Sequence, residues 1–274
     1  MAEYINFVNG DWQLASKSTV SLYDAGFLLG DGLFETIRFQ NGRLFQPEKH
    51  LKRLHSGLNI IQIKLDKSNT ELISCLEEMV LRNDIRSGLL RLMITRGKIE
   101  GTPWNFTGIP NVYISIRPLT EEPKEPVKVV FYPERKYPII RFNPAIKSLN
   151  YIGNMLAKKN AEKEGAFEPV FFNRDGNVTE CAIRNIFFIQ DKTLLTPNIE
   201  LGVLPGVMRD TIIDLAPDLD LLVSEENIPV DNINNMDEAF ISSTGIGLLP
   251  CYWDGWNSKF PITSILKEKL NALI

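Results

Sequence analysis

The chain has 274 residues, of which 44% are hydrophobic and 23% charged, and its formal net charge is −4, as expected for a globular protein with one large domain or two smaller ones. It contains no basic run of the kind that binds nucleic acid, and its apolar runs are too short to span a bilayer. Its three cysteines and two histidines lack the spacing of a disulfide framework or a metal site. No signal-peptide pattern is recognisable, so we expect a cytoplasmic protein.

Residues 1–117 predict a small N-terminal α/β domain. Two pairs of strands flank Asn-Gly turns, which favour tight hairpins, and two segments with apolar residues at helical spacing predict helices. In chain order, the expected elements are the hairpin of Tyr4–Val8 with Trp12–Leu14, the hairpin of Phe34–Phe39 with Arg43–Phe45, a helix from Pro47, a helix over Ser68–Asn83, and strands over Leu89–Thr95 and Val112–Arg117.

Residues 118–126 predict an interdomain linker, because they contain three prolines and four charged residues without periodicity. Residues 127–274 predict a larger C-terminal domain, so the fold class is α+β with two domains. Most of the strand connections are short, which favours an antiparallel, barrel-like sheet. The expected elements are strands over Val127–Tyr132, Val170–Phe172, Ile186–Ile189, Ala239–Ser242 and Leu248–Tyr252, and helices over Tyr151–Glu164 and Val207–Leu215.

Lys147 and Glu180 form the most informative pair of residues in the chain. Lys147 lies just before a predicted helix, and Glu180 precedes an apolar strand, where burial is costly without a positive partner. A lysine amine forms a Schiff base with an aldehyde cofactor, and a carboxylate keeps a pyridine nitrogen protonated. Taken singly, each of the two residues is more often a solvated surface charge.

Arg91 is a candidate for binding an anion. It shares a predicted strand face with Leu89 and Met93, and an arginine in such a strand requires an anion or a route to water. The anion is either the carboxylate of a substrate or a structural partner such as Glu35.

Six segments give the chain its resemblance to a known family. They are Gly30–Thr36, His50–Leu54, Lys147–Tyr151, Gly176–Glu180 with Asn185, Gly202–Arg209 and Ser242–Gly245. In this order and spacing, they resemble the class IV (fold-type IV) pyridoxal 5'-phosphate (PLP) enzymes, which include branched-chain aminotransferases, D-amino-acid aminotransferases and aminodeoxychorismate lyases. The resemblance covers nearly the whole chain, and it implies PLP as the cofactor and a barrel-like C-terminal domain that carries the cofactor lysine.

The resemblance also implies a role for single residues in holding the cofactor. Lys147 would be the Schiff-base lysine and the catalytic base, and Glu180 would face the pyridine nitrogen through a charge-assisted hydrogen bond. Tyr151 would donate to the phenolic oxygen of the cofactor. The phosphate would be bound by a guanidinium, by free N–H groups at a helix start and by a hydroxyl, supplied by Arg53, Val207, Met208 and Thr244.

Substrate binding is implied for Arg91, Arg38 and Gly245. Arg38 resembles the arginine that follows Phe-Glu in branched-chain enzymes, and Gly245 permits a close approach of the backbone. The family's active site lies between two domains and at a subunit interface, so the resemblance implies a homodimer. The loop Tyr23–Gly30 is the expected donor of residues to the partner.

The predicted activity is the transfer of an amino group between a branched-chain-like amino acid and a 2-oxo acid by a ping-pong mechanism. Aminodeoxychorismate lyase is the main alternative, because Arg96-Gly97 resembles the Arg-Gly pair of that group, although the lyases commonly have an arginine where this chain has Tyr151. D-amino-acid aminotransferase is a further alternative: the short segment between Lys147 and Tyr151 resembles that group, but its Arg-x-His sequence is missing from Arg96-Gly97-Lys98. A binding protein without activity is the third class, which intact Lys147 and Glu180 disfavour.

Overall fold

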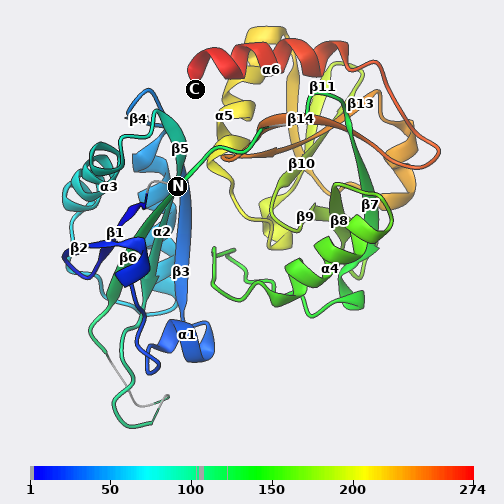
Figure 1. Ribbon diagram of the computed structural model, residues 1–274. Coiled ribbons are helices and arrows are strands. Elements are labelled where there is room, and N and C mark those ends of the chain that lie inside the picture. Colours follow the sequence, from blue (N-terminus) through cyan, green and yellow to red (C-terminus); the bar gives the residue numbers. More distant parts are fainter. Residues whose placement is uncertain (1–2, 103, 105–107, 122) are drawn as a thin grey trace. The chain divides into compact units, whose positions relative to one another are not determined.

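The computed structural model describes residues 3–102, 104, 108–121 and 123–274, and residue 122 of the predicted linker lies outside them. The chain divides into two compact units, each with its own sheet (Figure 1). The first unit comprises Met1–Thr120 and Ile146–Leu149, and the second comprises Glu121–Ala145 and Asn150–Ile274.

The first unit contains a six-stranded sheet, counted over the described residues, with the strand order β2-β1-β6-β5-β3-β4. Its neighbouring strands pair antiparallel, and both predicted Asn-Gly hairpins are present. The strands are β1 (Ile5–Val8), β2 (Asp11–Leu14), β3 (Gly32–Gln40), β4 (Arg43–Leu44), β5 (Ser87–Thr95) and β6 (Asn111–Pro118).

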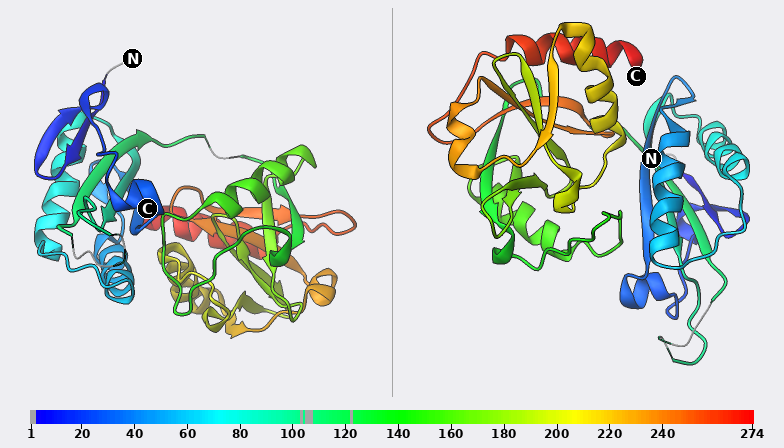
Figure 2. Two further views of the ribbon diagram at one scale, coloured as in Figure 1. Left: turned by 90° about the horizontal axis from the view of Figure 1, so that it is seen from below. Right: turned by 180° about the vertical axis from the view of Figure 1, so that it is seen from behind.

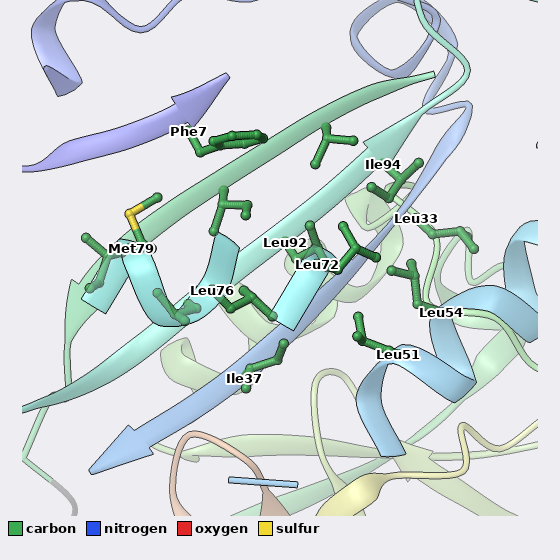
Figure 3. Packing of buried hydrophobic residues seen from close by; sticks show 14 of the residues in the cluster. Phe7, Leu33, Ile37, Leu51, Leu54, Leu72, Leu76, Met79, Leu92 and Ile94 are labelled. Carbon is green, nitrogen blue, oxygen red and sulfur yellow. The ribbon is translucent and has the colours of Figure 1, made fainter. Parts of the chain in front are cut away.

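Helices α2 (Pro47–Ile60) and α3 (Asn69–Asn83) cover one face of this sheet. Pro47 suits the first turn of α2 because its fixed φ is helical and it needs no hydrogen-bond partner there. Ser68 and Glu71 form a capping box at the start of α3. Leucines on both helices interlock with Leu33, Ile37, Leu92 and Ile94 from the strands, and this apolar core (Figure 3) fixes which strand residues point toward the helices.

The second unit is built around an eight-stranded sheet, counted over the described residues, with the order β12-β11-β10-β13-β14-β7-β8-β9. The sheet is mixed, whereas the short connections predicted an antiparallel one: β11 with β12, β14 with β7, and β7 with β8 pair parallel, and the other neighbours pair antiparallel. The strands are β7 (Val127–Pro133), β8 (Glu168–Phe172), β9 (Val178–Cys181), β10 (Asn185–Gln190), β11 (Thr193–Pro197), β12 (Leu222–Glu226), β13 (Glu238–Ser243) and β14 (Gly247–Tyr252).

Helices pack on the second sheet (Figure 2). Helix α4 (Ile152–Lys163) packs against β8, whereas α5 (Val207–Leu215) and α6 (Pro261–Leu273) pack against β13 and, for α6, β14. The fully buried carboxylate of Glu238 accepts hydrogen bonds from the N–H groups of Ile262 and Thr263, at 2.9 and 2.8 Å. It therefore satisfies two donors that the start of α6 would otherwise leave unpaired.

The position of Lys147 differs from the sequence expectation. We expected this lysine within the C-terminal segment 127–274, but Ile146–Leu149 packs with the first unit. The reason is backbone pairing with β3, which periodicity in the sequence does not reveal. Among the described residues, no helix is long and apolar enough to cross a membrane.

Candidate functional site

The two faces of the first sheet carry different chemistry. Successive strand residues point to opposite faces, and Thr36 lies opposite Arg91 whereas Glu35 lies opposite Leu92. Glu35 therefore points toward the helices, and Arg91 belongs to the other face. The register rules out the alternative in which Arg91 forms a structural pair with Glu35.

The Lys147 segment joins the free edge of β3. The N–H of Phe34 donates to the carbonyl of Lys147 at 3.0 Å, and the N–H of Leu149 donates to the carbonyl of Gly32 at 3.1 Å. Ser148 pairs with Leu33 in an antiparallel bridge and is buried. Because neighbouring residues alternate, Lys147 is directed to the face that carries Phe34.

Phe34 is the contact point of two cations. The Nζ atom of Lys147 lies 4.5 Å from the centre of the Phe34 ring, and Cζ of Arg91 lies 4.4 Å from it. Both distances are typical of cation–π contacts. Arg38 lies on the same strand face two positions beyond Thr36. The structure thus brings Lys147, Arg91 and Arg38 to one face of the sheet.

A pocket of about 290 Å³ and a smaller one of about 130 Å³ open in the first unit. The smaller pocket is lined by Arg91 together with the hydroxyl-bearing residues Thr36 and Ser115. A guanidinium beside two hydroxyls is a donor-rich environment that suits a carboxylate. The larger pocket is mainly apolar and lies beside Asp24 and Phe27.

Arg53 is held by Glu35 on the helix-covered side of the sheet. Its Nε and Nη2 atoms donate to the two carboxylate oxygens at 2.8 and 2.6 Å, and Nδ1 of His50 lies 2.8 Å from the same carboxylate. Glu35 and His50 are fully buried, while 12% of the Arg53 side chain is exposed. Glu35 therefore fixes the orientation of both basic side chains.

Burial and neighbouring charges set the pKa values of Glu35 and His50. Although burial raises the pKa of Glu35, Arg53 and the hydrogen bond from His50 together lower it to about 2. Burial lowers the pKa of His50, and the positive charges of Arg53 and Lys147 lower it further. Because Glu35 is ionised, Nδ1 of His50 must donate to it. The buried Nε2 atom of His50 has no hydrogen-bond partner within the described part of the chain.

In the second unit, Glu180 on β9 is bound by two donors. The guanidinium of Arg141 donates to Oε1 of Glu180, and the N–H of Leu204 donates to Oε2 at 3.2 Å. Arg141 also donates to Glu134 at 2.7 Å. About 14% of the Glu180 side chain is exposed, so this carboxylate is held in a fixed orientation and is still accessible to solvent.

The loop before α5 is fixed by the same strands. The side-chain amide of Asn185 donates to the carbonyl of Leu204 at 2.9 Å, and a Cβ atom on Gly206 would lie only 2.1 Å from Oδ1 of Asn185. A glycine is thus required at position 206. No side chain caps α5 at Gly206, and the first N–H groups of a helix have no partner within it. Val207 and Met208 supply such groups.

The other predicted residues of the second unit lie at element ends. Thr244 and Gly245 are half-buried in the turn between β13 and β14. This turn lies two residues beyond Ser242, which pairs with Asn185. Tyr151 is the half-buried residue immediately before α4.

Each unit has features that suit one part of PLP. The first unit offers the amine of Lys147 and a buried, unpartnered ring nitrogen on His50 beside Arg53. The second offers an oriented carboxylate at Glu180 and an uncapped helix start at Gly206. Carboxylates bind pyridinium N–H groups, and helix starts bind phosphate. The residues therefore fit the cofactor that the sequence implies.

The sequence pattern did not mark Arg141 or Glu134, and it gave no reason to assign a role to His50. Arg141 lies in a segment without regular structure, so no periodicity marked it, and its partners come from other elements. Arg96, the basis for the lyase alternative, forms an ion pair with Asp31 at 2.6 Å and also donates to the carbonyl of Ile61. These contacts give Arg96 a structural role that ties β5 to the end of α2.

Known proteins share both the sequence and the fold. Residues 32–252 match the family model described as amino-transferase class IV. A protein of Methanocaldococcus jannaschii, whose provisional name is branched-chain-amino-acid aminotransferase, is 32% identical over 276 residues, which cover 97% of this chain and 95% of that protein. A D-alanine aminotransferase of Listeria monocytogenes is 32% identical over 255 residues, which cover 89% of this chain and 85% of the relative.

A crystal structure of the branched-chain aminotransferase from Thermoproteus uzoniensis with norvaline superimposes with a TM-score of 0.91. The match covers 98% of this chain and 94% of the other, at 24% sequence identity. This similarity confirms the fold-type IV architecture that the sequence predicted.

Proposed function

Because the chain belongs to the class IV aminotransferases, we propose that it transfers the amino group of a branched-chain-like amino acid to a 2-oxo acid, with Lys147 as its catalytic residue. The cofactor is pyridoxal 5'-phosphate, which supplies an electron sink for negative charge at the substrate α-carbon. The match of residues 32–252 to the family model carries this proposal.

Lys147 would hold the cofactor through its amine, and the same amine would move a proton away from the substrate α-carbon. The amine must be uncharged to accept that proton. The contact of Nζ with Phe34 supports this role, since the aromatic ring limits the directions that the amine can take.

Glu180 holds the ring nitrogen of the cofactor in its protonated form. Arg53, the N–H groups of Val207 and Met208, and the hydroxyl of Thr244 bind the phosphate. Tyr151 donates to the phenolic oxygen. The bidentate contact of Arg53 with Glu35 and the uncapped start of α5 support the phosphate assignments.

Substrate carboxylates are bound by Arg91, with Arg38 and Gly245 as further walls of the substrate site. The pocket of about 130 Å³ beside Arg91 supports this assignment. Arg91 is exposed, so it is accessible to a small anion, and its contact with Phe34 keeps the guanidinium close to the Lys147 amine.

A D-amino-acid substrate is the second candidate, because one of the relatives is a D-alanine aminotransferase at 32% identity. The substrates can be separated by measuring turnover with a panel of L- and D-amino acids and 2-oxo acids, with aminodeoxychorismate included. Turnover of L-leucine, L-isoleucine and L-valine above that of every D-amino acid is the expected result. A preference for D-alanine would overturn the branched-chain assignment.

We also propose that the protein is a cytoplasmic homodimer. Helix α1 (Ala25–Leu29) exposes 64% of Phe27, 50% of Leu28 and 52% of Leu29, and contiguous exposed apolar residues mark interaction surfaces. The fully buried carboxylate of Asp24 caps α1 through the N–H of Gly26 at 2.8 Å, so these residues are presented on a fixed element. Light scattering of the purified protein measures the oligomeric state.

The decisive test replaces Lys147. The variant Lys147→Ala should lose more than about 10⁴-fold in turnover, because both the covalent attachment and the general base are removed. It should also lose the visible absorbance of the covalently attached cofactor. Lys52→Ala, which removes an exposed lysine of α2, is the matched control. If Lys147→Ala still attaches the cofactor covalently, another lysine carries it and the assignment fails.

A further inference from the structure

Arg141 is the centre of a closed group of polar side chains in the second unit. Its Nε donates to Glu134 at 2.7 Å, its Nη1 donates to Glu180, and its Nη2 donates to the hydroxyl of Thr179 at 3.1 Å. The hydroxyl of Thr179 in turn donates to Glu134 at 2.8 Å. All three kinds of guanidinium nitrogen are therefore used, and rotation of the Glu180 carboxylate is restrained from one side.

The N–H of Leu204 restrains Glu180 from the other side by donating to Oε2 at 3.2 Å. The carboxylate is thus held between a guanidinium and a backbone donor. The aromatic ring of Phe171 packs against Arg141, with Cζ 6.0 Å from the ring centre. The group combines residues 134–141 with Thr179 and Glu180 of β9 and with Leu204, so its geometry depends on the packing of segments that are distant in sequence.

The charges within the group do not cancel. One guanidinium faces two carboxylates, and only 18% of Arg141 and 19% of Glu134 are exposed. Burial by itself would lower the pKa of Arg141, but the charges of Glu180 and Glu134 outweigh it and raise that pKa. Arg141 is permanently charged, so with both acids ionised the group carries an excess of one negative charge, which attracts a further cation.

We propose that Arg141 is a positioning residue that orients Glu180 toward the ring nitrogen of the cofactor, and that Glu134 balances its charge so that Glu180 keeps its affinity for the ring-nitrogen proton. This inference rests on the proposed function, in which Glu180 is the partner of that nitrogen. Arg141 alone would draw negative charge away from Glu180. Because Glu134 shares the guanidinium, Glu180 can be held firmly and still attract a proton.

Few other charged or titratable groups face Glu180 among the described residues. The buried thiol of Cys181 follows it on β9, and burial, the charge of Glu168 and that of Glu180 all raise the pKa of this thiol. Glu168 is neutralised by its ion pair with Arg184. Burial raises the pKa of Glu168 as well. The charged groups that bond to Glu180 or share its guanidinium partner are Arg141 and Glu134, so the charge balance at Glu180 depends on this pair.

The proposal predicts opposite effects for the two partners of Glu180. Replacing Arg141 with methionine removes a positive charge, so the ring nitrogen should keep its proton to higher pH. Replacing Glu134 with glutamine removes a negative charge but preserves an oxygen acceptor, so the nitrogen should lose its proton at lower pH. A single neighbouring charge shifts such an equilibrium by about one pH unit or more.

The experiment measures the nitrogen-15 chemical shift of PLP labelled at the ring nitrogen and bound to each purified holoenzyme, as a function of pH. Wild type is compared with Arg141→Met, Glu134→Gln and the conservative variant Arg141→Lys. The midpoint is the pH at which half of the ring nitrogen has lost its proton. We expect it to rise in Arg141→Met, to fall in Glu134→Gln and to return toward wild type in Arg141→Lys. Lys128→Met breaks an ion pair with Asp254 elsewhere in the same unit and should leave the midpoint unchanged.

Midpoints that stay unchanged in both Arg141→Met and Glu134→Gln would overturn the proposal, as would shifts in the same direction. Glu180→Gln separates this failure from failure of the proposed function. If Glu180→Gln deprotonates the ring nitrogen while the other variants do nothing, only the roles of Arg141 and Glu134 are wrong. If Glu180→Gln has no effect on the nitrogen either, the assignment of Glu180 itself is wrong. Glu134→Gln is nearly isosteric, so the test survives if Arg141→Met fails to fold.

Discussion

The two units use arginine and glutamate in opposite proportions. In the first unit, one carboxylate, that of Glu35, serves two basic side chains, Arg53 and His50. In the second, one guanidinium, that of Arg141, serves two carboxylates, those of Glu134 and Glu180. Glu35 is fully buried, whereas 14% of the Glu180 side chain is exposed.

This difference in exposure separates the roles of the two acids: Glu35 is an anchor that holds another side chain in place, and Glu180 is a group that can bind a ligand. A fully buried acid that is bonded on every side has no capacity left for a ligand, so Glu35 holds Arg53 in place and presents that cation. Glu180 remains accessible and lies in a group with excess negative charge, so it can accept a further donor. The same pair of residue types thus presents a cation in one unit and an anion in the other.

Glu180→Gln tests the exposed acid of this comparison. The variant should retain the cofactor but lose about 10²–10⁴-fold in turnover, the range that is typical of a lost proton-transfer group, because an unprotonated pyridine is a poor electron sink. Steady-state kinetics with the best amino acid measures this. Glu162→Gln, at an exposed position of α4, is the control, and near-normal turnover of Glu180→Gln would make that acid structural only.

Glu35→Gln tests the anchor. Removing one partner of a buried ion pair typically costs about 3–5 kcal/mol, so the free energy of unfolding should fall by that amount, and cofactor retention should weaken because Arg53 loses its orientation. Urea denaturation of the apo-protein measures the first effect. Glu78→Gln breaks a surface pair with Arg82, which is 40% exposed, and should cost at most about 1 kcal/mol. Equal losses in the two variants would refute the anchor role.

Arg91→Leu asks whether the face opposite Glu35 binds substrate. Because Arg91 is exposed, we expect a smaller effect than for a buried pair: KM for amino acids should rise about tenfold, which corresponds to about 1.4 kcal/mol. The melting temperature should hardly change, as is usual for surface substitutions. Arg43→Leu, on the edge strand β4, is the control. Lost stability with an unchanged KM would instead indicate a structural arginine.

His50 should make the stability of the apo-protein sensitive to mild acid. Its pKa is lowered from 6.5 in the folded state, so below that value the unfolded chain binds more protons and stability falls. A second loss should follow as pH falls from 4.5 toward 2, where Glu35 protonates in the unfolded state first. Melting temperatures across this range measure both. His50→Gln should flatten the first decline and His55→Gln should not; an equal decline in both variants would contradict the assignment.

Local sequence patterns were sufficient to predict the individual helices, strands and turns. The Asn-Gly hairpins, the helix over Ser68–Asn83, the proline at the start of α2 and the span Val207–Leu215 of α5 were all predicted correctly. Each depends on residues that are close in sequence, such as turn formers, caps and apolar residues at helical spacing. The resemblance carried by six short segments added the family and the cofactor, which the comparisons confirm.

Only the tertiary structure decided how these elements meet. Pairing with β3 placed Lys147 with the first unit, and the register of β3 with β5 excluded a contact between Glu35 and Arg91. The sequence showed Arg141 as one arginine in an irregular segment; the fold surrounded it with Glu134, Thr179 and Glu180. Hydrogen bonds between residues far apart in the chain leave no periodic signal, so the sequence by itself determined the elements and the family, and long-range packing determined the chemistry that each side chain meets.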